Sequence, residues 1–192
     1  DAIASCNKCK YAANVERAEI KLQGSAVRDQ GAEKERPLEK IATPGMKTVE
    51  DVSGFLKTIP QKLIKTLIYD SDKGVFAAIV RGDYELNENK LKRLLDVERL
   101  HLADEEIVRK TTNAPSGFAG PIGLKTRLIA DYSIQSIVNG ITGANEADTH
   151  FINVNPGRDF QVDTFADLRM AVKGDPCPRC NGGNLEIFRG IE

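Results

Sequence analysis

Tryptophan is absent from this 192-residue chain, and histidine occurs only twice. His101 and His150 lie far apart in the sequence, so a serine–histidine triad or a histidine-bound catalytic metal has few candidates. The motifs of phosphate loops, dinucleotide-binding folds, zinc proteases and α/β-hydrolases are missing as well. The sequence therefore gives no support to these enzyme classes.

Long apolar runs are also missing. The longest run, VFAAIV at 75–80, is far shorter than the roughly 20 residues of a membrane-spanning helix. No charged-then-apolar leader opens the sequence, so we expect a soluble, cytosolic protein without membrane contact. Because the chain begins at Asp1 and stops just after a strand-like run, we also expect it to be a piece of a longer protein.

An excess of positive charge is lacking too, since 27 Lys and Arg residues are balanced by 28 Asp and Glu. The chain has no overall basic field of the kind that drives salt-sensitive binding to a nucleic-acid backbone. A contact with nucleic acid would therefore have to be local. The candidates are Lys90, Lys92 and Arg93 on one expected helix and the KERPLEK run at 34–40, although the charge pattern favours a solvated face for each.

The residues that are present predict one core with a small appendage. Thr48 begins a capping box, and apolar residues at helical spacing follow it to Leu56. Alternation at 63–69 and 75–81 predicts a β-hairpin with a longer loop. Further expected elements are helices at 14–20, 87–95, 103–110, 132–140 and 165–172, and strands at 127–131 and 150–155. Because helices and strands are mixed without regular alternation, we expect an α+β domain with a mixed β-sheet flanked by helices.

The stretch SGFAGPIG at 116–123 contains three glycines and a proline. Glycine lets another molecule approach the backbone closely, and clustered N–H groups can bind an anion or stabilise developing negative charge. A tight turn between two elements is the alternative, and the loop alone favours it.

Four cysteines form two CxxC pairs at opposite ends of the chain, Cys6 with Cys9 and Cys177 with Cys180. Four thiolates suit a tetrahedral structural Zn²⁺, and the glycines after Cys180 are typical of a zinc knuckle. Two disulfides or unmetallated thiols are the alternatives. A structural role for all four leaves no cysteine to act as a nucleophile.

Three polar residues interrupt apolar patterns. Lys65 shares a strand face with leucines, where its ammonium group needs an anion or a route to solvent. His150 alternates with Ile152 and Val154, which suits a satisfied core histidine as well as a functional one. Asp131 closes a strand and is either a cap for the next helix or an acid in a cleft.

Several ordered motifs together resemble one family. They are YAANVERAE, KTLIY, VRGDYELNENKL, GFAGPIGL, IAD, TGANEADTHFINVNPGRDF, ADLR, and GDPCPRC followed by LEIFRGIE. The chain resembles, over essentially its whole length, the editing domain inserted between class II motifs 2 and 3 of bacterial-type prolyl-tRNA synthetases. That domain is similar in fold to the free-standing Cys-tRNA and Ala-tRNA deacylases.

The resemblance implies hydrolysis of Ala-tRNA(Pro) in cis. A pocket shaped for proline cannot strongly reject a smaller amino acid, because a missing methylene is worth only about 1–3 kcal/mol, so a second site must remove the small product. The implied partners are the 3′ acceptor end of tRNA(Pro) and the rest of a synthetase that is homodimeric and cytoplasmic. ATP and Mg²⁺ would serve only the missing synthetase core, and the editing chemistry would need no cofactor.

The resemblance also implies roles for individual residues. The family's GxxxP loop would hold the 3′ end of the aminoacyl-tRNA and face the ester carbonyl; it matches Gly117, Phe118, Ala119, Gly120 and Pro121. Lys65 matches the essential lysine and would meet the phosphate or ribose of the terminal adenosine. No side-chain nucleophile is required, since bound water, an oxyanion cradle and the substrate's own ribose hydroxyl could suffice for an activated ester.

The remaining matches concern the amino-acid pocket. His150 is expected to line the pocket and help set its size, and Asp131 matches the family's aspartate. The apolar pocket positions correspond to Val49, Val52 and Leu63.

The paired CxxC knuckles occur in only some relatives, so the zinc prediction depends on spacing. We expect an N-terminal flank at 1–45 with the first knuckle, an editing domain at 46–172 and a C-terminal flank at 173–192 with the second. The alternative function is a zinc-stapled module that binds the tRNA acceptor end with little activity outside the full enzyme. A free-standing deacylase fits poorly, because the chain lacks a natural start.

Overall fold

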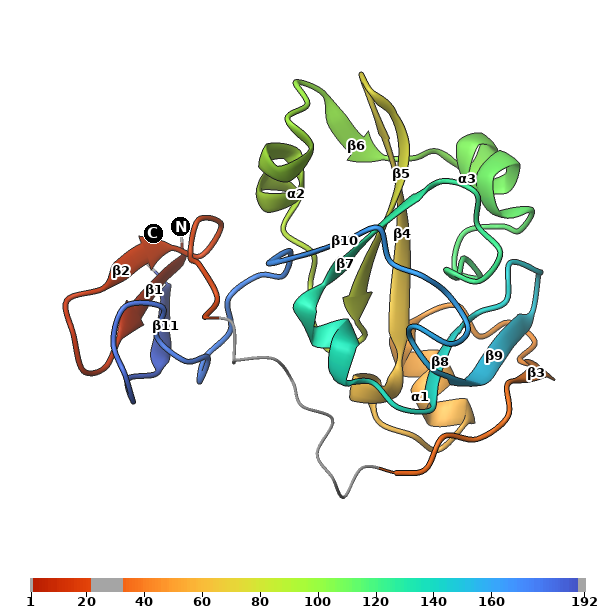
Figure 1. The fold of residues 1–192 in the computed structure, drawn as a ribbon, viewed down its shortest axis with the longest axis horizontal. Coiled ribbons are helices and arrows are strands. Elements are labelled where there is room, and N and C mark those ends of the chain that lie inside the picture. Colours follow the sequence, from red (N-terminus) through yellow and green to blue (C-terminus); the bar gives the residue numbers. More distant parts are fainter. Residues whose placement is uncertain (1, 22–32, 190–192) are drawn as a thin grey trace.

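The two ends of the described chain pair with each other in one small sheet (Figure 1). The structure, a computed structural model, describes residues 2–21 and 33–189. The three strands run antiparallel in the order β11-β1-β2, with β1 at Ala2–Cys6, β2 at Ala12–Asn14 and β11 at Leu185–Arg189. This pairing brings the two CxxC segments together, as the sequence predicted for a knuckle pair that joins the ends.

A mixed five-stranded sheet forms the centre of the larger part. Its order is β10-β7-β5-β4-β6, with β4 at Ile64–Ser71, β5 at Gly74–Arg81, β6 at Leu100–Leu102, β7 at Arg127–Asp131 and β10 at Thr164–Ala166. The pairs of β4 with β5 and β6 are antiparallel, and the pairs of β7 with β5 and β10 are parallel. The expected mixed sheet is therefore confirmed.

The β4–β5 hairpin is tighter than predicted. Ser71 pairs with Gly74, so only Asp72 and Lys73 remain in the loop, and the expected longer loop is wrong. Gly74 has a φ of +108°, which a side chain would strain, and the Ser71 hydroxyl donates to the Gly74 carbonyl while it accepts from the Lys73 N–H. These local bonds close the turn in two residues.

A second sheet has the order β3-β9-β8 and is antiparallel, with β3 at Glu39–Ala42, β8 at Gly140–Gly143 and β9 at Thr149–Val154. A bridge between Leu63 and Ile141 joins it to the start of β4. β3 precedes residue 46, so a strand of the larger part lies before the predicted domain boundary. The two sheets meet where β4 begins, which is the position of the site described below.

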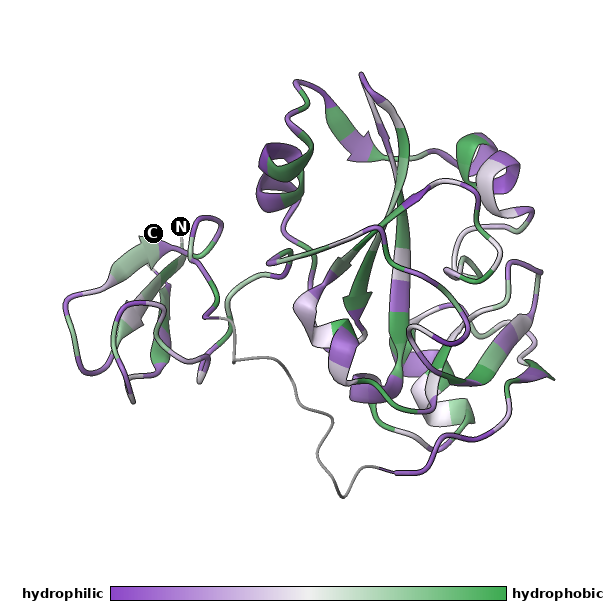
Figure 2. Cartoon of the chain, in the orientation of Figure 1, coloured by the Kyte–Doolittle hydropathy of each residue, from purple (hydrophilic) through white to green (hydrophobic). Residues whose placement is uncertain are grey.

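Three α-helices lie against these sheets, α1 at Val49–Phe55, α2 at Glu88–Leu95 and α3 at Glu105–Thr112. Each begins at a side-chain N-cap, Thr48, Asn87 and Asp104 respectively. In Figure 2 β5 is mostly green, whereas α2 carries both colours, as expected for a helix with one buried face. Leu91 and Leu95 of α2 pack on one side of the sheet with Tyr69, Phe76, Ala78 and Ile129, and Val108 of α3 packs on the other with Ile64, Ile68, Ala77 and Ile79.

The helices predicted at 14–20 and 165–172 are absent from the structure, and the helix predicted at 132–140 is only partly present. Asn14 ends β2 and a single turn follows it, because the N–H groups of Glu19 and Ile20 donate to the Tyr11 hydroxyl and the Asp167 carboxylate instead of continuing a helix. Residues 165–172 contain β10, and the N–H groups of Leu168 and Arg169 donate to the carboxylate of Asp131, so they do not start a helix. The expected helix at 132–140 is a 3₁₀ helix at Tyr132–Ser136.

Membrane insertion finds no support in the helices of the two described ranges. None of them combines the length and the apolar character needed to cross a bilayer.

Candidate functional site

A cleft of about 320 Å³ opens where the two sheets and α1 meet. It is lined from α1 by Val49 and Val52, from the start of β4 by Leu63 and Lys65, from β9 by His150, and from the glycine-rich loop by Gly117 and Ala119. Seven of the predicted site residues, distant in sequence, therefore share one cavity.

The glycine-rich loop is held against β8 by contacts that only glycine permits. A Cβ on Gly120 would lie 1.8 Å from the Gly143 carbonyl oxygen, and a Cβ on Gly143 would lie 2.3 Å from the Phe118 carbonyl oxygen. Gly117 has a φ of +96°, in the left-handed region that favours glycine. The Asn145 side chain accepts from the Gly120 N–H at 2.8 Å and donates to the Gly120 carbonyl at 3.0 Å. The loop is thus fixed in shape rather than a simple connection.

Two N–H groups of this loop are available to a ligand. Gly117 and Ala119 line the cleft, and neither backbone N–H has an acceptor among the residues that the structure describes. By contrast, Phe118 is buried with 1% exposure, Gly120 is bonded to Asn145, and Pro121 lies outside the cleft. Within the predicted five-residue motif, Gly117 and Ala119 are the two residues that both line the cleft and have an N–H without an acceptor among the described residues.

Lys65 reaches the cleft and has an acidic partner there. Its ammonium nitrogen lies 3.2 Å from a carboxylate oxygen of Glu85, whose side chain is 82% exposed and also lines the cleft. The strand position therefore brings the charged group to an anion, one of the two outcomes expected from the sequence. Because Glu85 is so exposed, this ion pair is weak and can be exchanged for another anion.

His150 is buried and fixed in orientation. Its Nδ1 lies 2.6 Å from the hydroxyl oxygen of Thr43, a residue with no exposed surface, and its ring meets Phe118 edge-on with 5.8 Å between ring centres. Burial lowers the pKa of His150 below its usual value, so the imidazole is neutral at pH 7. Thr43 was missed because it follows β3 and meets His150 only through the β3–β9 pairing.

The apolar wall of the cleft is a small cluster of its own. Val52, Leu63 and Ile141 are nearly fully buried, and Val49 packs against them. The Thr48 capping box fixes the start of α1, with the Thr48 hydroxyl accepting from the Asp51 N–H and the Asp51 carboxylate accepting from the Thr48 N–H. This wall offers a small apolar surface beside the free N–H groups.

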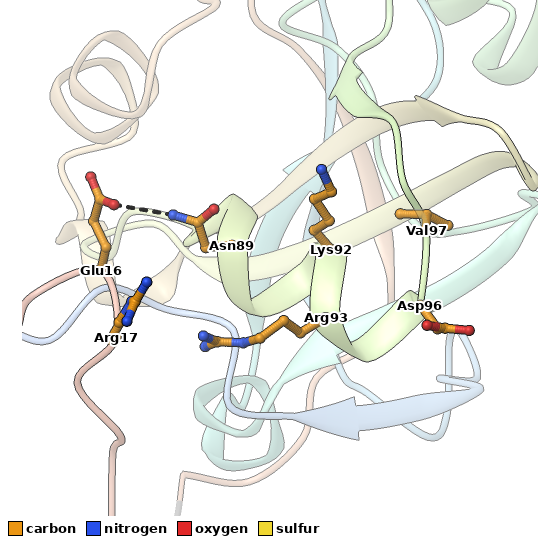
Figure 3. A pocket seen from close by; sticks show the side chains of 7 residues that line it. All are labelled: Glu16, Arg17, Asn89, Lys92, Arg93, Asp96 and Val97. Carbon is orange, nitrogen blue, oxygen red and sulfur yellow. Dashed lines mark hydrogen bonds between the residues drawn. The ribbon is translucent and has the colours of Figure 1, made fainter.

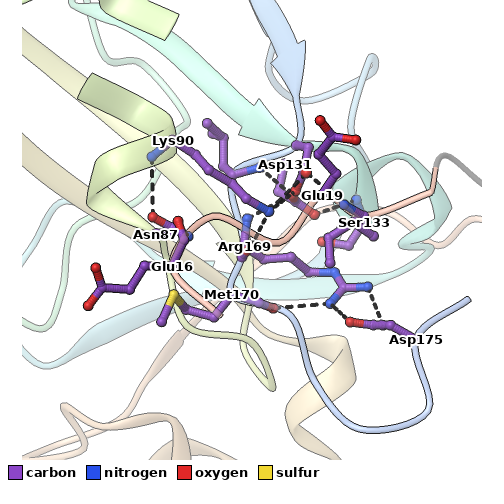
Figure 4. A network of polar contacts seen from close by, with 12 residues as sticks. Glu16, Glu19, Asn87, Lys90, Asp131, Ser133, Arg169, Met170 and Asp175 are labelled. Carbon is purple, nitrogen blue, oxygen red and sulfur yellow. Dashed lines mark hydrogen bonds and ion pairs between the residues drawn. The ribbon is translucent and has the colours of Figure 1, made fainter. Parts of the chain in front are cut away.

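Asp131 lies away from the cleft, at 2% exposure. One of its carboxylate oxygens accepts from the Ser133 N–H, and the other accepts from the N–H groups of Leu168 and Arg169 (Figure 4). Of the two alternatives that the sequence left open for it, the geometry matches the cap. The carboxylate joins the end of β7 to the segment that leads to the second knuckle.

Around Asp131, a network of buried charges ties the two parts of the molecule together (Figure 4). Lys90 of α2 donates to Asp167 at 2.7 Å, and Asp167 accepts the N–H of Ile20 from the N-terminal segment. Arg169 and Asp175 form a two-bond pair at 2.6 and 2.8 Å. Burial lowers the pKa of Lys90 and raises that of Asp167, which is the direction that desolvation gives for each group. Lys90 is therefore an internal residue and drops out of the surface cations considered from the sequence.

The four cysteine sulfurs lie within 4.8 Å of one another. The Cys6–Cys180 and Cys9–Cys177 sulfurs are each 3.7 Å apart, close to the roughly 3.8 Å edge of a tetrahedron built on metal–sulfur bonds of about 2.3 Å. All four are free thiols rather than disulfides.

Backbone donors and a glycine complete this cluster. The N–H groups of Lys8 and Cys9 donate to the Cys6 sulfur, and the Lys8 N–H contributes most to lowering the pKa of that thiol to about 6. The N–H groups of Tyr11 and Arg179 donate to the sulfurs of Cys9 and Cys177. A Cβ on Gly183 would lie 2.5 Å from the Cys6 sulfur, so the glycine keeps the space beside the sulfurs open. The donor set fits a tetrahedral thiolate-bound metal.

The other histidine belongs to neither site. His101 lies on β6 and faces Asp70 of β4 at 3.6 Å, with about half of its side chain exposed. It is a surface residue of the sheet edge, whereas its apolar sequence context had favoured a core position like that of His150.

Comparison with known proteins gives consistent results. The sequence model of the aminoacyl-tRNA editing domain family matches residues 43–160. Proline–tRNA ligases of Geotalea daltonii and Geobacter metallireducens are 52% and 53% identical over 192 residues, covering 100% of this chain and 33% of each relative. The chain therefore spans about a third of the length of the curated relatives that it matches.

Two solved structures share the fold. A protein assigned as a trans-editing enzyme for prolyl tRNA synthetase gives a TM-score of 0.60 at 20% identity, covering 70% of this chain and 87% of that one. A protein described only as hypothetical gives a TM-score of 0.59 at 22% identity, covering 69% and 91%. At these identities the likeness concerns the fold alone.

Proposed function

Since this chain belongs to the aminoacyl-tRNA editing domain family, we propose that it is the editing domain of a proline–tRNA ligase and hydrolyses the ester of mischarged Ala-tRNA(Pro) in cis. The observation that carries the proposal is the pair of free N–H groups of Gly117 and Ala119 in a cleft that also holds Lys65 and His150. The full-length relatives supply the identity of the tRNA.

The amino-acid specificity follows from the apolar wall. Val49, Val52 and Leu63 offer a small apolar surface for the alanine methyl group, and the buried ring of His150 limits the space beyond it. We propose that this part of the cleft accepts the methyl group and excludes the five-membered ring of proline. The selection is therefore by exclusion of the larger, correct product, which complements a synthetic site that cannot exclude the smaller one.

The reaction needs no side-chain nucleophile. A bound water attacks the ester carbonyl, and the resulting oxyanion accepts hydrogen bonds from the N–H groups of Gly117 and Ala119. As the intermediate collapses, the bond to the ribose oxygen breaks, and that oxygen takes up the proton that the attacking water gives up, which releases alanine and the free 3′ end. Neutral His150, held by Thr43, shapes the pocket without adding a charge beside the α-ammonium group of the substrate.

Lys65 positions the RNA end. Its ammonium exchanges Glu85 for a phosphate or ribose oxygen of the terminal adenosine, and the exposure of Glu85 makes this exchange inexpensive. A phosphate is a stronger acceptor for a charge-assisted hydrogen bond than a solvated glutamate.

The test is deacylation of Ala-tRNA(Pro) and Pro-tRNA(Pro) by the wild type, by Lys65→Ala and by Lys110→Ala as a control on the exposed face of α3. We expect loss of alanine but not proline, abolished by Lys65→Ala and unchanged by Lys110→Ala. If tRNA(Pro) binds but neither ester is cleaved, the chain is instead a module that binds the acceptor end. Cleavage that survives Lys65→Ala would place the reaction outside this cleft.

For the cysteine cluster we propose a structural Zn²⁺ held by Cys6, Cys9, Cys177 and Cys180. The ion would supply cross-linking of the two chain ends and no step of the hydrolysis. Residues 2–21 and 173–189 would form this knuckle unit, and the editing unit would extend from β3, ahead of the expected boundary at 46, to residue 172. The rest of the synthetase, homodimeric and cytoplasmic, would contain the ATP and Mg²⁺ sites.

A further inference from the structure

A second cavity, of about 580 Å³, lies between the N-terminal segment and α2 (Figure 3). Glu16 and Arg17 line it from the turn after β2, and Asn89, Lys92 and Arg93 line it from α2. Neither the knuckle unit nor the helix forms this groove alone. It exists only because the two parts of the chain dock on each other.

The cations of the groove have no acidic partner in the described part of the chain, whereas each of its two acids accepts a hydrogen bond. Arg17, Lys92 and Arg93 have no ion-pair partner anywhere in residues 2–21 and 33–189. Glu16 accepts from the Asn89 side chain at 3.1 Å, and Asp96 accepts from Lys73 at 3.2 Å. Figure 3 shows the guanidinium groups of Arg17 and Arg93 pointing toward the space between their two segments. Two like charges that converge without an acid between them form a site for an anion.

The second basic segment considered from the sequence, the run at 34–40, differs from the groove because two of its cations have acidic partners. In the run at 34–40, Arg36 pairs with Glu33 at 3.2 Å and Lys40 pairs with Glu146 at 2.6 Å. Arg36 and Lys40 therefore each have an acidic neighbour, which Arg17, Lys92 and Arg93 lack among the described residues. Local positive charge that is not used within the chain is therefore more concentrated in the groove than in that run.

The groove is also preorganised. The Asn87 side chain donates to the Glu16 carbonyl at 2.9 Å, which fixes the turn that carries Arg17 against the start of α2. Lys90 follows the groove residue Asn89 in α2, and its ammonium group donates to the carboxylate of Asp167. The same carboxylate accepts the N–H of Ile20, so it connects α2 to the N-terminal segment. Arg17 and Arg93 are consequently held on backbones that do not need to rearrange before binding.

The groove lies next to the cleft along the chain. Glu85 lines the cleft and Asn89 lines the groove, so their Cα atoms can be at most about 14 Å apart. A nucleic-acid strand that ends in the cleft can therefore reach the groove within a few nucleotides. We propose that Arg17, Lys92 and Arg93 bind backbone phosphates of the tRNA acceptor end while its 3′ terminus occupies the cleft. This inference rests on the proposed function.

The first experiment measures binding of uncharged tRNA(Pro) by fluorescence anisotropy over a range of salt concentrations. The variant is Arg17→Gln/Arg93→Gln, and the control is Arg99→Gln/Lys110→Gln, which removes the same charge from exposed residues outside the groove. We expect the groove variant to bind about tenfold more weakly at low salt and its salt slope to fall by about two, one for each lost phosphate contact. The control should lose little affinity and keep its slope.

The second experiment separates the groove from the cleft. Alanine is esterified either to whole tRNA(Pro) or to a short acceptor-end oligonucleotide, and hydrolysis is followed with both proteins. The groove variant should raise KM about tenfold for whole tRNA, leave kcat unchanged, and leave the short substrate unaffected.

The outcomes distinguish the two proposals. If the wild type cleaves neither ester, the proposed function fails, and the salt titration still decides whether the groove binds RNA. If the groove and control variants bind tRNA equally well, the groove is not an RNA contact, and its cations serve another anion, such as an acidic protein surface. Equal KM increases for both substrates would also overturn the proposal, because the groove would then act through the cleft.

Discussion

Two sites of this molecule present backbone N–H groups, and the sites differ in what those groups do. At the cysteine cluster, the N–H groups of Lys8, Cys9, Tyr11 and Arg179 all donate to sulfur. In the cleft, the N–H groups of Gly117 and Ala119 have no acceptor within the described part of the chain. Satisfied donors stabilise a fixed structure, whereas unsatisfied donors in a cavity are available to a ligand. The same backbone feature thus serves structure at one site and, in our proposal, chemistry at the other.

The largest effect is expected at the cysteine cluster. Cys177→Ser removes one of four thiolates, and structural zinc sites bind with about 10–16 kcal/mol, so the variant should lose stoichiometric zinc and the small sheet should unfold. Metal analysis and thiol titration of the purified protein check this. The control is His101→Ala, which removes a side chain able to bind metal at a position outside the cluster, and this variant should keep one zinc per chain. Full zinc content in Cys177→Ser would refute the assignment.

In the cleft, the strongest test is a substitution that shifts the glycine-rich loop but does not alter the residues whose N–H groups are the proposed donors. Gly120→Ala places a Cβ within 1.8 Å of the Gly143 carbonyl, which must push the loop away from β8 and displace the N–H groups of Gly117 and Ala119. We expect kcat for Ala-tRNA(Pro) to fall about 10²- to 10³-fold, the range for losing an oxyanion donor. Gly54→Ala, where a Cβ meets nothing within 4 Å, is the matched control. An unchanged kcat in Gly120→Ala would remove the loop from the mechanism.

The substitution Asp131→Asn tests whether Asp131 is a cap or a catalytic acid. In Asp131→Asn, an amide NH₂ replaces one oxygen that accepts backbone N–H groups, so a buried donor loses its partner. We expect the free energy of unfolding, measured with urea, to fall by about 1–3 kcal/mol. The kcat of the folded variant should equal that of the wild type. A large drop in kcat without loss of stability would contradict the assignment as a cap.

The smallest effect is a pH dependence from His150. Burial lowers its pKa in the folded state below the value of about 6.5 in the unfolded chain, so the unfolded state binds the proton more readily. The stability that neutral His150 permits is fully present above pH 6.5 and is lost as the pH falls toward the depressed folded-state pKa. Urea unfolding between pH 5 and 8 should therefore show a steeper loss for the wild type than for His150→Gln. Parallel curves would mean that His150 does not titrate differently in the two states.

Much of the local structure could be predicted from the sequence. Side chains nearby in the sequence predicted the Thr48 and Asn87 caps and the strands that contain Lys65 and Asp131. They also predicted a helix at 103–110, which the structure has at Glu105–Thr112. The failures at 14–20 and 165–172 have one cause. Backbone donors of the two segments bond to Tyr11, Asp167 and Asp131, and β10 pairs with β7, so the local helical patterns gave way to bonds with other parts of the chain.

Some residues of the candidate site could likewise be predicted from the sequence, and others could not. The sequence indicated Lys65, His150 and the glycine-rich loop, because each is an unusual residue or composition in its setting. It could not indicate Thr43 or Glu85, since an ordinary threonine and an ordinary glutamate meet His150 and Lys65 only in the folded chain. It also grouped Lys90 with Lys92 and Arg93, whereas the fold buries Lys90 and replaces it with Arg17 in the groove.

By itself, the sequence determined the chemical components of this protein: four thiols in two pairs, a loop whose glycines free the backbone, one lysine among leucines, and a balanced net charge. These depend only on which residues occur and on near neighbours in the chain. The tertiary structure alone decided which N–H groups remain free, which carboxylate is a cap, and which cations stay unpaired. Those properties depend on contacts between residues far apart in sequence, where close packing and hydrogen-bond satisfaction are settled for the whole fold at once.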